Sequence, residues 1–433
     1  MGQTGRWLAA VRRARVWILA AAILVAIIVA SGSRWDFLLG ILIFVLALLI
    51  SVMLHEFGHF ITAKKFGMRV TQFFVGFGTT LWSVFRGETE YGVKALPFGG
   101  FVKITGMTSM EEVDVADEPR SFRNQPGWQR IIVLAAGSFM HFVLALFLLF
   151  ALALGVGMAE NSNQISAVTS CVPDNVTAVN SATPCAGGGL GTSPAVKAGL
   201  RASDRIISLA GKPVTSFNQL HSVLKSQQPG VPVPIVIVRN GHELHLTVTL
   251  AKVPKDSVSY LGMEPVTIYQ RDSFGGSIAF AGSQFADTIT SSVSAIGRLP
   301  AAIPDLFAKD RAKTPAGDVS SVVGVGDVTG DVVAASLPWQ AKVTLVMYLV
   351  ASLNIFVGLF NLLPLLPLDG GHLAVVIFER IRAWFARLRG RPDPGLVDIQ
   401  KLVPVSLLVF AVLVGLGTLL IAADIFNPVH IQV

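Results

Sequence analysis

The sequence predicts an α-helical, multi-pass membrane protein with about five transmembrane helices, a re-entrant β-hairpin or sheet and a soluble α/β domain inserted between two spans. Hydrophobic residues make up 52% of the 433 residues and charged residues only 14%, which is unusual for a water-soluble protein. Long segments also lack Asp, Glu, Lys and Arg altogether. These segments are residues 16–31, 37–54, 131–159, 343–368 and 402–423.

The lengths of these segments indicate which of them can cross about 30 Å of hydrocarbon. The last three are long enough, and residues 37–54 become long enough if the polar motif that follows forms their inner end. Residues 16–31 are short, which is typical of a short span or of a signal-peptide core. No clear A-x-A cleavage pattern follows them, and another hydrophobic segment begins almost at once. We therefore expect a retained first helix.

The distribution of positive charge predicts the orientation of the chain. Arginines precede the first span and are expected to stay in the cytoplasm. Five spans then place residues 64–130 and 369–401 inside and residues 160–342 outside. Both inner segments are rich in Lys and Arg, which agrees with that count. The net charge of +7 therefore indicates topology and contact with the lipid bilayer, not binding to nucleic acid.

The most informative motif is HEFGH, residues 55–59, at the end of an uncharged segment. His55 and His59 are four residues apart, so on a helix they share one face and can bind one Zn²⁺. Glu56 between them is the usual general base of a zinc peptidase. Ionisable groups at a membrane edge are costly and are therefore functional candidates. The motif predicts a zinc site that uses water at the edge of the membrane.

A zinc peptidase needs three protein ligands, and the best candidate for the third is Asp369 in NLLPLLPLDGG, residues 361–371. The predicted topology places it at the inner end of the fourth span, at the depth of the two histidines. Pro364 and Pro367 break a helix, and Gly370 and Gly371 allow a sharp turn that can aim the carboxylate at a metal. The alternative is that Asp369 only caps a helix as it leaves the membrane.

The segments between the spans carry different patterns. Residues 70–84 are apolar and β-prone, and residues 90–105 predict a hairpin that turns at Pro97–Gly100. Cys171 and Cys185 both fall in the outer segment and favour a disulfide over two unpaired thiols. Residues 273–307 indicate a long amphipathic helix. The glycine-rich residues 320–331 indicate a loop.

The outer segment 164–253 has the pattern of a soluble α/β domain. Its expected elements are a strand at 204–209, a short amphipathic helix at 217–226, and strands at 233–239 and 243–250 around the turn Asn240-Gly241. This order resembles a PDZ domain of the circularly permuted bacterial type. PDZ domains bind extended peptides by adding a strand to a sheet edge. The alternative is that the domain only obstructs access to the membrane site.

Together, HEFGH and NLLPLLPLDGG resemble the site-2 protease family of intramembrane metalloproteases. The chain is most similar to the bacterial branch with an extracytoplasmic PDZ domain, in particular to actinobacterial members with a single PDZ domain. The resemblance implies that His55, His59 and Asp369 bind zinc, that Glu56 activates the water and that Asn361 stabilises the oxyanion. The alternative for Asn361 is a helix–helix hydrogen bond, a role that fits Asn354 better.

The resemblance also implies a partner and a location. The substrate is expected to be a transmembrane protein, such as an anti-sigma factor, that an upstream site-1-type protease has already cut outside the membrane. The enzyme is expected in the bacterial plasma (inner) membrane, with its PDZ domain outside and its zinc site near the cytoplasmic side. The segment 90–105 resembles the re-entrant β-loop of the family, whose edge strand is suited to hold the unwound substrate.

Two further histidines lie near the motifs. The family often has Gly-Pro-x-x-Asn where this chain has Gly137-Ser-Phe-Met-His141. His141 is expected to bond a neighbouring helix; the alternatives are that it lines the cavity, assists substrate binding or binds metal. His372 is expected beside the site or at the surface.

Two other functions are compatible with parts of the sequence. A prenyl-protein endopeptidase also uses HExxH, but it usually takes its third ligand from a later glutamate and lacks both the Leu-Asp-Gly motif and a PDZ domain. A non-catalytic membrane scaffold that presents a PDZ domain would have no reason to keep Glu56 between two histidines.

The expected organisation has nine parts. In order they are an added N-terminal helix, 1–36; the helix with HEFGH, 37–63; a cytoplasmic or re-entrant β region, 64–130; a transmembrane helix, 131–159; the PDZ domain, 164–253; an outer amphipathic helix and loop, 254–342; a transmembrane helix with NLLPLLPLDGG, 343–371; a basic cytoplasmic segment, 372–401; and a last transmembrane helix, 402–423.

Overall fold

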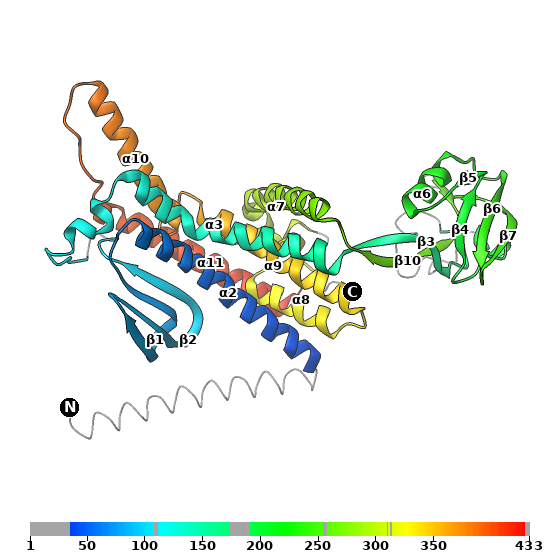
Figure 1. Cartoon of the computed structure of the whole chain (residues 1–433), viewed down its shortest axis with the longest axis horizontal. Coiled ribbons are helices and arrows are strands. Elements are labelled where there is room, and N and C mark those ends of the chain that lie inside the picture. The colour runs from blue at the N-terminus through cyan, green and yellow to red at the C-terminus, as the bar shows by residue number, and fades with distance from the viewer. Residues whose placement is uncertain are drawn as a thin grey trace, which may run out of the picture. The chain divides into compact units, whose positions relative to one another are not determined.

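The protein is described here by a computed structural model. It describes residues 35–107, 111–173, 185, 191–253, 258–309, 311 and 314–428. The expected first helix therefore lies outside the described residues. The chain forms two compact units, and we refer to residues 156–272 as the inserted unit and to the rest as the helical unit (Figure 1).

Four helices of the helical unit are long and apolar enough to cross a membrane, among the residues that the structure describes. They include α2, α3, α9 and α11, with bounds Trp35–Lys65, Gly127–Ala151, Trp339–Asn361 and Val403–Phe426. A short π-helix, Leu152–Val156, extends α3. Four of the five expected spans are therefore helical.

The span that carries NLLPLLPLDGG is shorter than expected. Helix α9 ends at Asn361, and a separate helix α10, Asp369–Leu388, begins after a break that contains Pro364 and Pro367. The predicted break at the two prolines is therefore present, but the transmembrane helix ends at residue 361 and does not continue to the expected residue 371. Gly370 and Gly371 also form no sharp turn, because they lie in the first turn of α10. Added Cβ atoms there would meet the backbone of residues 362–366, so both glycines permit this close approach.

Two long strands, β1 (Val70–Arg86) and β2 (Thr89–Ile104), follow α2 and pair with each other. The expected hairpin at 90–105 is wrong, because the chain turns at Gly87, where φ is 63°, between the paired residues Arg86 and Thr89. Both strands bend, so Val75 pairs with Val93 as well as with Gly100.

The predicted turn at Pro97–Gly100 is instead a bulge inside β2. Val75 pairs with Gly100 and Phe77 pairs with Leu96, so three residues of β2 lie opposite one residue of β1. Gly99 has φ of 116°, a conformation that side chains rarely adopt. Gly and Pro mark an irregular strand here as readily as they mark a turn.

An ion network ties the tip of the β-sheet to neighbouring segments. Glu88 accepts hydrogen bonds from Arg120 at 2.7 and 2.8 Å and from Lys64 at 2.7 Å. The bonds from Arg120, followed by the bond from Lys64, lower the pKa of Glu88 to about 2. The network joins the end of α2 to a segment with two short 3₁₀ helices, Glu118–Arg120 and Phe122–Asn124.

The expected amphipathic helix is α7, Phe274–Ala302, with Ser273 as its N-cap. Short 3₁₀ helices at Ile303–Asp305 and Pro315–Asp318 follow. The expected loop at 320–331 is wrong, because residues Val322–Ala334 form helix α8. A Cβ on Gly40 of α2 would lie 2.7 Å from the Cα atom of Gly330. The glycines are present because α8 packs closely on α2, not because the chain turns.

The inserted unit is built on a six-stranded sheet with the order β10-β3-β4-β6-β7, and β5 pairs with β4. These strands are β3 Met158–Val168, β4 Arg205–Leu209, β5 Lys212–Pro213, β6 Pro232–Arg239, β7 His242–Thr249 and β10 Met263–Gln270. The remaining elements are α5 Pro194–Lys197, α6 Phe217–Ser226, β8 Ala251–Val253 and β9 Val258–Tyr260. Helix α6 packs on the sheet through Leu220, which is fully buried with Ile206 and Ile237.

The elements expected in this unit are present, and its helix has the predicted bounds. The turn between β6 and β7 has positive φ at Asn240 (51°) and Gly241 (82°), as the Asn-Gly pair predicts. The compact unit extends beyond the expected 164–253, because β10 pairs with β3. Cys171 and Cys185 form the expected disulfide.

Candidate metal centre

Helix α2 brings His55 and His59 to one face, and helix α3 packs directly against that face. An added Cβ on Gly58 would overlap the carbonyl of Ala136 on α3. An added Cβ on Gly137 would overlap Nε2 of His59 and would lie 2.5 Å from Cε1 of His55. The two glycines therefore allow α3 to cover the imidazole rings.

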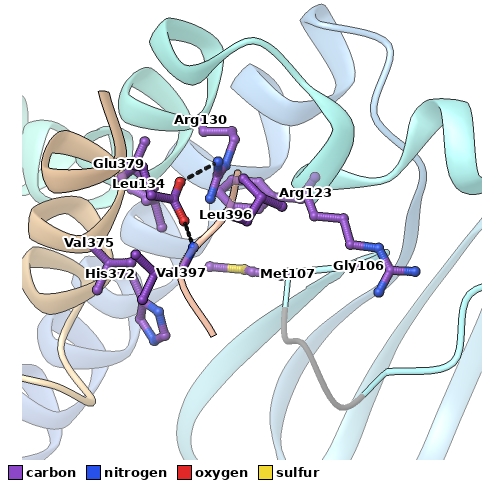
Figure 2. A pocket seen from close by; sticks show the side chains of 12 residues that line it. Gly106, Met107, Arg123, Arg130, Leu134, His372, Val375, Glu379, Leu396 and Val397 are labelled. Atoms are coloured by element: carbon purple, nitrogen blue, oxygen red, sulfur yellow. Dashed lines mark hydrogen bonds and ion pairs between the residues drawn. The ribbon is translucent and has the colours of Figure 1, made fainter. Parts of the chain in front are cut away.

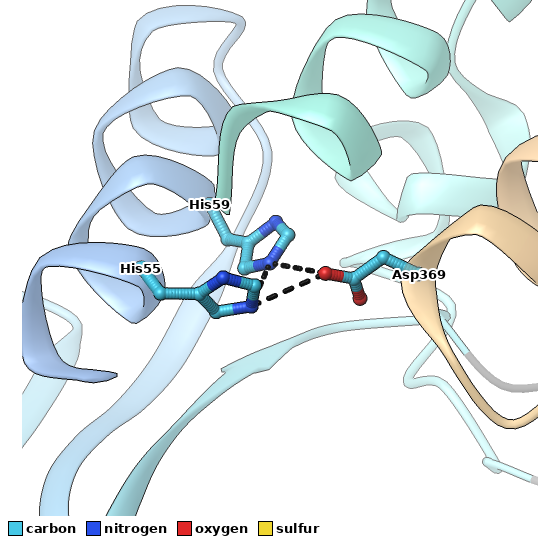
Figure 3. Close-up of side chains that lie close together, drawn as sticks. All are labelled: His55, His59 and Asp369. Atoms are coloured by element: carbon cyan, nitrogen blue, oxygen red, sulfur yellow. Dashed lines mark hydrogen bonds and ion pairs between the residues drawn. The ribbon is translucent and has the colours of Figure 1, made fainter. Parts of the chain in front are cut away.

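Three potential ligand atoms converge from two distant parts of the chain (Figure 3). The Nε2 atoms of His55 and His59 are 3.2 Å apart. Oδ2 of Asp369, the first residue of α10, lies 3.2 Å from each of them. His55 is 8% exposed and His59 is 4% exposed, so the three atoms meet in a largely dry environment.

The hydrogen bonds around these atoms favour a cation site. Nδ1 of His59 donates to the carbonyl of Val133 at 2.7 Å, so in the neutral ring Nε2 carries a lone pair. Oδ2 of Asp369 is buried, and the polar atoms that face it are the Nε2 atoms of the two histidines. Electron-rich atoms that face one another in a buried site repel unless a cation lies between them. Two imidazoles and one carboxylate are the ligand set of a catalytic zinc site with an open position.

Glu56 is positioned by strand β2. The backbone N–H of Val102 donates to Oε2 of Glu56 at 3.0 Å. An added Cβ on Gly100 would lie 2.6 Å from Sδ of Met53, so this glycine lets the strand approach α2 closely. The sheet thus fixes the carboxylate of Glu56, the residue that follows His55 in sequence. A general base beside a metal site must be held in this way within reach of the proton that it removes.

The two candidate asparagines occupy different environments. Asn361 is the last residue of α9, is half-buried, and its side chain makes no hydrogen bond to the described residues. Asn354 is 1% exposed, accepts from Oγ of Ser51 at 2.5 Å and donates to the carbonyl of Val350 at 2.8 Å. The expected helix–helix role of Asn354 is confirmed, and Asn361 keeps a free amide.

Helix α10 is anchored beside a cavity of about 120 Å³ (Figure 2). Arg130 of α3 donates to Oε2 of Glu379 at 2.8 Å, and the other carboxylate oxygen accepts from the backbone N–H of Val397 at 2.8 Å. His372 lines the same cavity and is half-buried. The buried ion pair therefore fixes the helix that begins with Asp369.

Several residues that support the site were not identified from the sequence. In the sequence, Arg130 is one of several positive charges of an inner segment and Glu379 carries no distinguishing signal, although the structure joins the two in a buried ion pair. The carbonyl of Val133 carries no sequence signal, because every residue has one. Gly58 has a weak signal, because a small residue between two ligands permits close helix packing.

Comparisons with known proteins relate nearly the whole chain to one family. The model of "Peptidase family M50" matches residues 43–391. The zinc metalloprotease Rip1 of Mycobacterium tuberculosis is 37% identical over 417 residues, which cover 91% of this chain and 99% of that protein. Rip1 of Mycolicibacterium smegmatis is 34% identical over 416 residues, covering 91% and 98%.

A more distant relative and one solved structure also match. The metalloprotease MmpA of Caulobacter vibrioides is 26% identical over 376 residues, covering 78% of this chain and 86% of its own. A PDZ domain of an SdrC-like protein from Listeria monocytogenes covers 24% of this chain and 88% of its own. Its identity is 17% and its TM-score is 0.17, a value that carries no argument about the fold.

Proposed function

Because this chain belongs to peptidase family M50, the site-2 protease family, and is an intramembrane zinc protease, we propose that it cleaves transmembrane proteins at the site formed by His55, His59 and Asp369. The observation that carries this proposal is the convergence of the Nε2 atoms and Oδ2 within 3.2 Å, with the general-base candidate Glu56 between the two histidines in sequence. Asp369 supplies the third ligand, where a prenyl-protein endopeptidase would use a later glutamate.

Each polar residue of the site has a proposed role. Zinc, when bound, polarises the peptide carbonyl and makes a water molecule nucleophilic near neutral pH. Glu56, held by the N–H of Val102, takes the proton from the attacking water and returns it to the leaving amine. Asn361, whose amide is free, donates to the oxygen on which negative charge develops.

The substrate class follows from the family and from the apolar surroundings of the site. We propose anti-sigma factors, cut first by an upstream site-1-type protease, as substrates. A transmembrane helix must be unwound before its peptide bonds can be attacked, and the sheet of β1 and β2 offers backbone groups that can bind an extended chain. We further propose that the inserted unit is an extracytoplasmic PDZ domain that refuses uncut substrate, and that the zinc site faces the cytoplasmic side.

The membrane proteome of the producing cell tests this function. Glu56→Gln removes the general base and preserves side-chain volume, so truncated membrane stubs of the substrates should accumulate with this variant and disappear with the wild-type protein. Glu112→Gln, the same substitution at an exposed cytoplasmic position, is the matched control and should behave as wild type. Identical stub profiles for Glu56→Gln and wild type would contradict the proposal.

A further inference from the structure

We propose that His141 is a positioning residue for the zinc ligand His55: its Nε2 accepts the Nδ1–H of His55, and Ser51 and Asn354 hold it for this task. The inference deepens the proposed peptidase function and rests on it. His141 lies on α3 and is not one of the three residues whose ligand atoms converge.

The first step concerns Nδ1 of His55, a donor that lacks an acceptor among the described residues. A metal-binding histidine usually donates its second ring N–H to an acceptor, which fixes the orientation of the ring. His59 has such an acceptor in the carbonyl of Val133. Nδ1 of His55 is buried and has no hydrogen-bond partner among the described residues. If Nε2 of His55 faces the metal, Nδ1 carries the proton and needs an acceptor.

The second step is the position of His141. The ring centroids of His55 and His141 are 5.0 Å apart, and the ring planes are inclined by 44°. Gly137 precedes His141 by one helical turn and contacts both ligand imidazoles, so His141 lies on the face of α3 that covers the site. His141 is 3% exposed. The structure contains no direct hydrogen bond from Nδ1 of His55 to His141, so the proposed link forms by a rotation of the rings or through one bridging water.

The third step is the tautomer of His141. Asn354 donates through Nδ2 to the carbonyl of Val350, so its Oδ1 is the acceptor. This Oδ1 lies 2.8 Å from Nδ1 of His141 and also accepts from Oγ of Ser51. Nδ1 of His141 therefore carries the proton, and in the neutral ring Nε2 carries a lone pair. A lone pair on His141 complements the N–H of His55.

Zinc retention tests this role without a need for the substrate. His141→Phe removes the acceptor, and loss of such a partner weakens metal affinity by about 10- to 100-fold. His141→Gln keeps an amide oxygen that can accept the same hydrogen bond, so its zinc retention against a chelator should stay near that of wild type. Ser138→Ala removes another buried polar group from the same helix and should leave retention unchanged.

Two outcomes would overturn the proposal. Either His141→Phe retains zinc as tightly as wild type, or His141→Gln loses as much as His141→Phe. If the phenylalanine variant does not fold, ¹⁵N NMR of histidine-labelled, zinc-loaded wild type decides: Nε2 of His141 must be unprotonated, and a proton on it refutes the assignment. If the His55→Ala variant retains zinc as tightly as wild type, the proposed function itself is refuted. The two failures are therefore distinguishable.

Discussion

The metal centre depends on a residue with no side chain, Gly137. This glycine is the point at which α3 touches the imidazoles of His55 and His59. A methyl group there has no free space, since the nearest atoms belong to the two rings that must hold their orientation. The tolerance of the site for substitution therefore depends on this contact as well as on the ligands.

Gly137→Ala is expected to displace the ligand histidines and to lower both zinc content and proteolytic rate, with a loss of about 100-fold in rate for a displacement of about 1 Å. Gly155→Ala, in the extension of the same helix, has open space around the added Cβ and serves as the control. Metal analysis and a cleavage assay on both variants measure the effect. A Gly137→Ala enzyme with the zinc content and rate of wild type would show that α3 can shift to accommodate the methyl group without displacing the histidines.

A second residue-scale prediction concerns Asp204 in the inserted unit. Burial opposes ionisation of Asp204, but Arg239, at 2.7 Å, and the N–H of Arg201 outweigh it and lower the pKa of this carboxyl. A lowered folded-state pKa stabilises the unit fully above the unfolded-state value of about 4. That contribution is lost as the pH falls through the folded-state pKa.

Asp204→Asn should therefore destabilise the inserted unit by about 1–3 kcal/mol at neutral pH and make its stability less dependent on pH below about 4. Both effects are measured by heating the full chain at several pH values and using protease cleavage within residues 156–272 to detect unfolding of the inserted unit. Asp272→Asn, at an exposed position of the same unit, is the control. An unchanged acid profile in Asp204→Asn would rule out the ion pair as the cause.

A buried ion pair holds helix α10 in place beside the site. Glu379 and Arg130 are each 8% exposed at the side chain. Removal of one partner leaves an uncompensated buried charge, which costs about 3–5 kcal/mol, whereas a well-packed apolar pair is often tolerated. Because α10 begins with Asp369, this element connects the cavity in Figure 2 to the metal ligands in Figure 3.

Glu379→Gln should lower the thermal stability of the detergent-solubilised protein and weaken zinc retention. The double variant Arg130→Met, Glu379→Leu should recover much of the stability, because no charge remains buried. Chelator competition and thermal unfolding measure the two effects separately. Equal behaviour of the single variant and wild type would show that α10 is held by other contacts.

Close packing of α8 on α2 supports a further prediction. Gly330→Leu places a side chain against Phe37 and the backbone of Gly40, and overpacking of this kind costs about 1–3 kcal/mol. Gly282→Leu on α7 has open space and should leave the unfolding temperature close to that of wild type. Similar unfolding temperatures for the two variants would contradict the packing role of this glycine.

The elements that sequence reasoning predicted are those whose signal is local. The four hydrophobic helices, helix α6 and the Asn240-Gly241 turn follow from hydropathy, periodicity and turn chemistry. The bulge at residues 97–99 and helix α8 do not. Gly and Pro indicate that the backbone is irregular or closely packed, but not whether the chain turns, bulges or contacts a neighbouring helix. Only the packing of the partner element shows which of these a glycine serves.

The same limit applies to the candidate site. HEFGH and the Leu-Asp-Gly motif name chemically suitable residues in advance, and the structure brings His55, His59 and Asp369 together. The support of the site was beyond reach, because Val102 N–H, the carbonyl of Val133 and the environment of His141 depend on tertiary contacts. Local sequence does not distinguish the two backbone groups from their neighbours. It does single out His141, whose expected bond to a neighbouring helix is confirmed, but it does not name the partner residues.

At the scale of the whole molecule, the chain combines a helical unit that holds the site with an inserted unit that has its own core. A deletion that tests the role of the inserted unit should remove residues 156–272. The shorter segment 164–253 would leave β10 behind, although this strand completes the sheet of the unit. If this unit refuses uncut substrate, the deletion variant should cleave substrate without the first cut, as immunoblots of tagged substrate would show. Continued refusal of uncut substrate would place the filter in the helical unit.

The most direct test of the central claim is the zinc content of the purified protein and of Asp369→Leu, with Asp393→Leu, at an exposed position, as the control. We predict one zinc per chain in wild type and in the control, and loss of that zinc in Asp369→Leu. An Asp369→Leu protein that retains one zinc per chain would contradict the claim that residues 55, 59 and 369 form a single metal site.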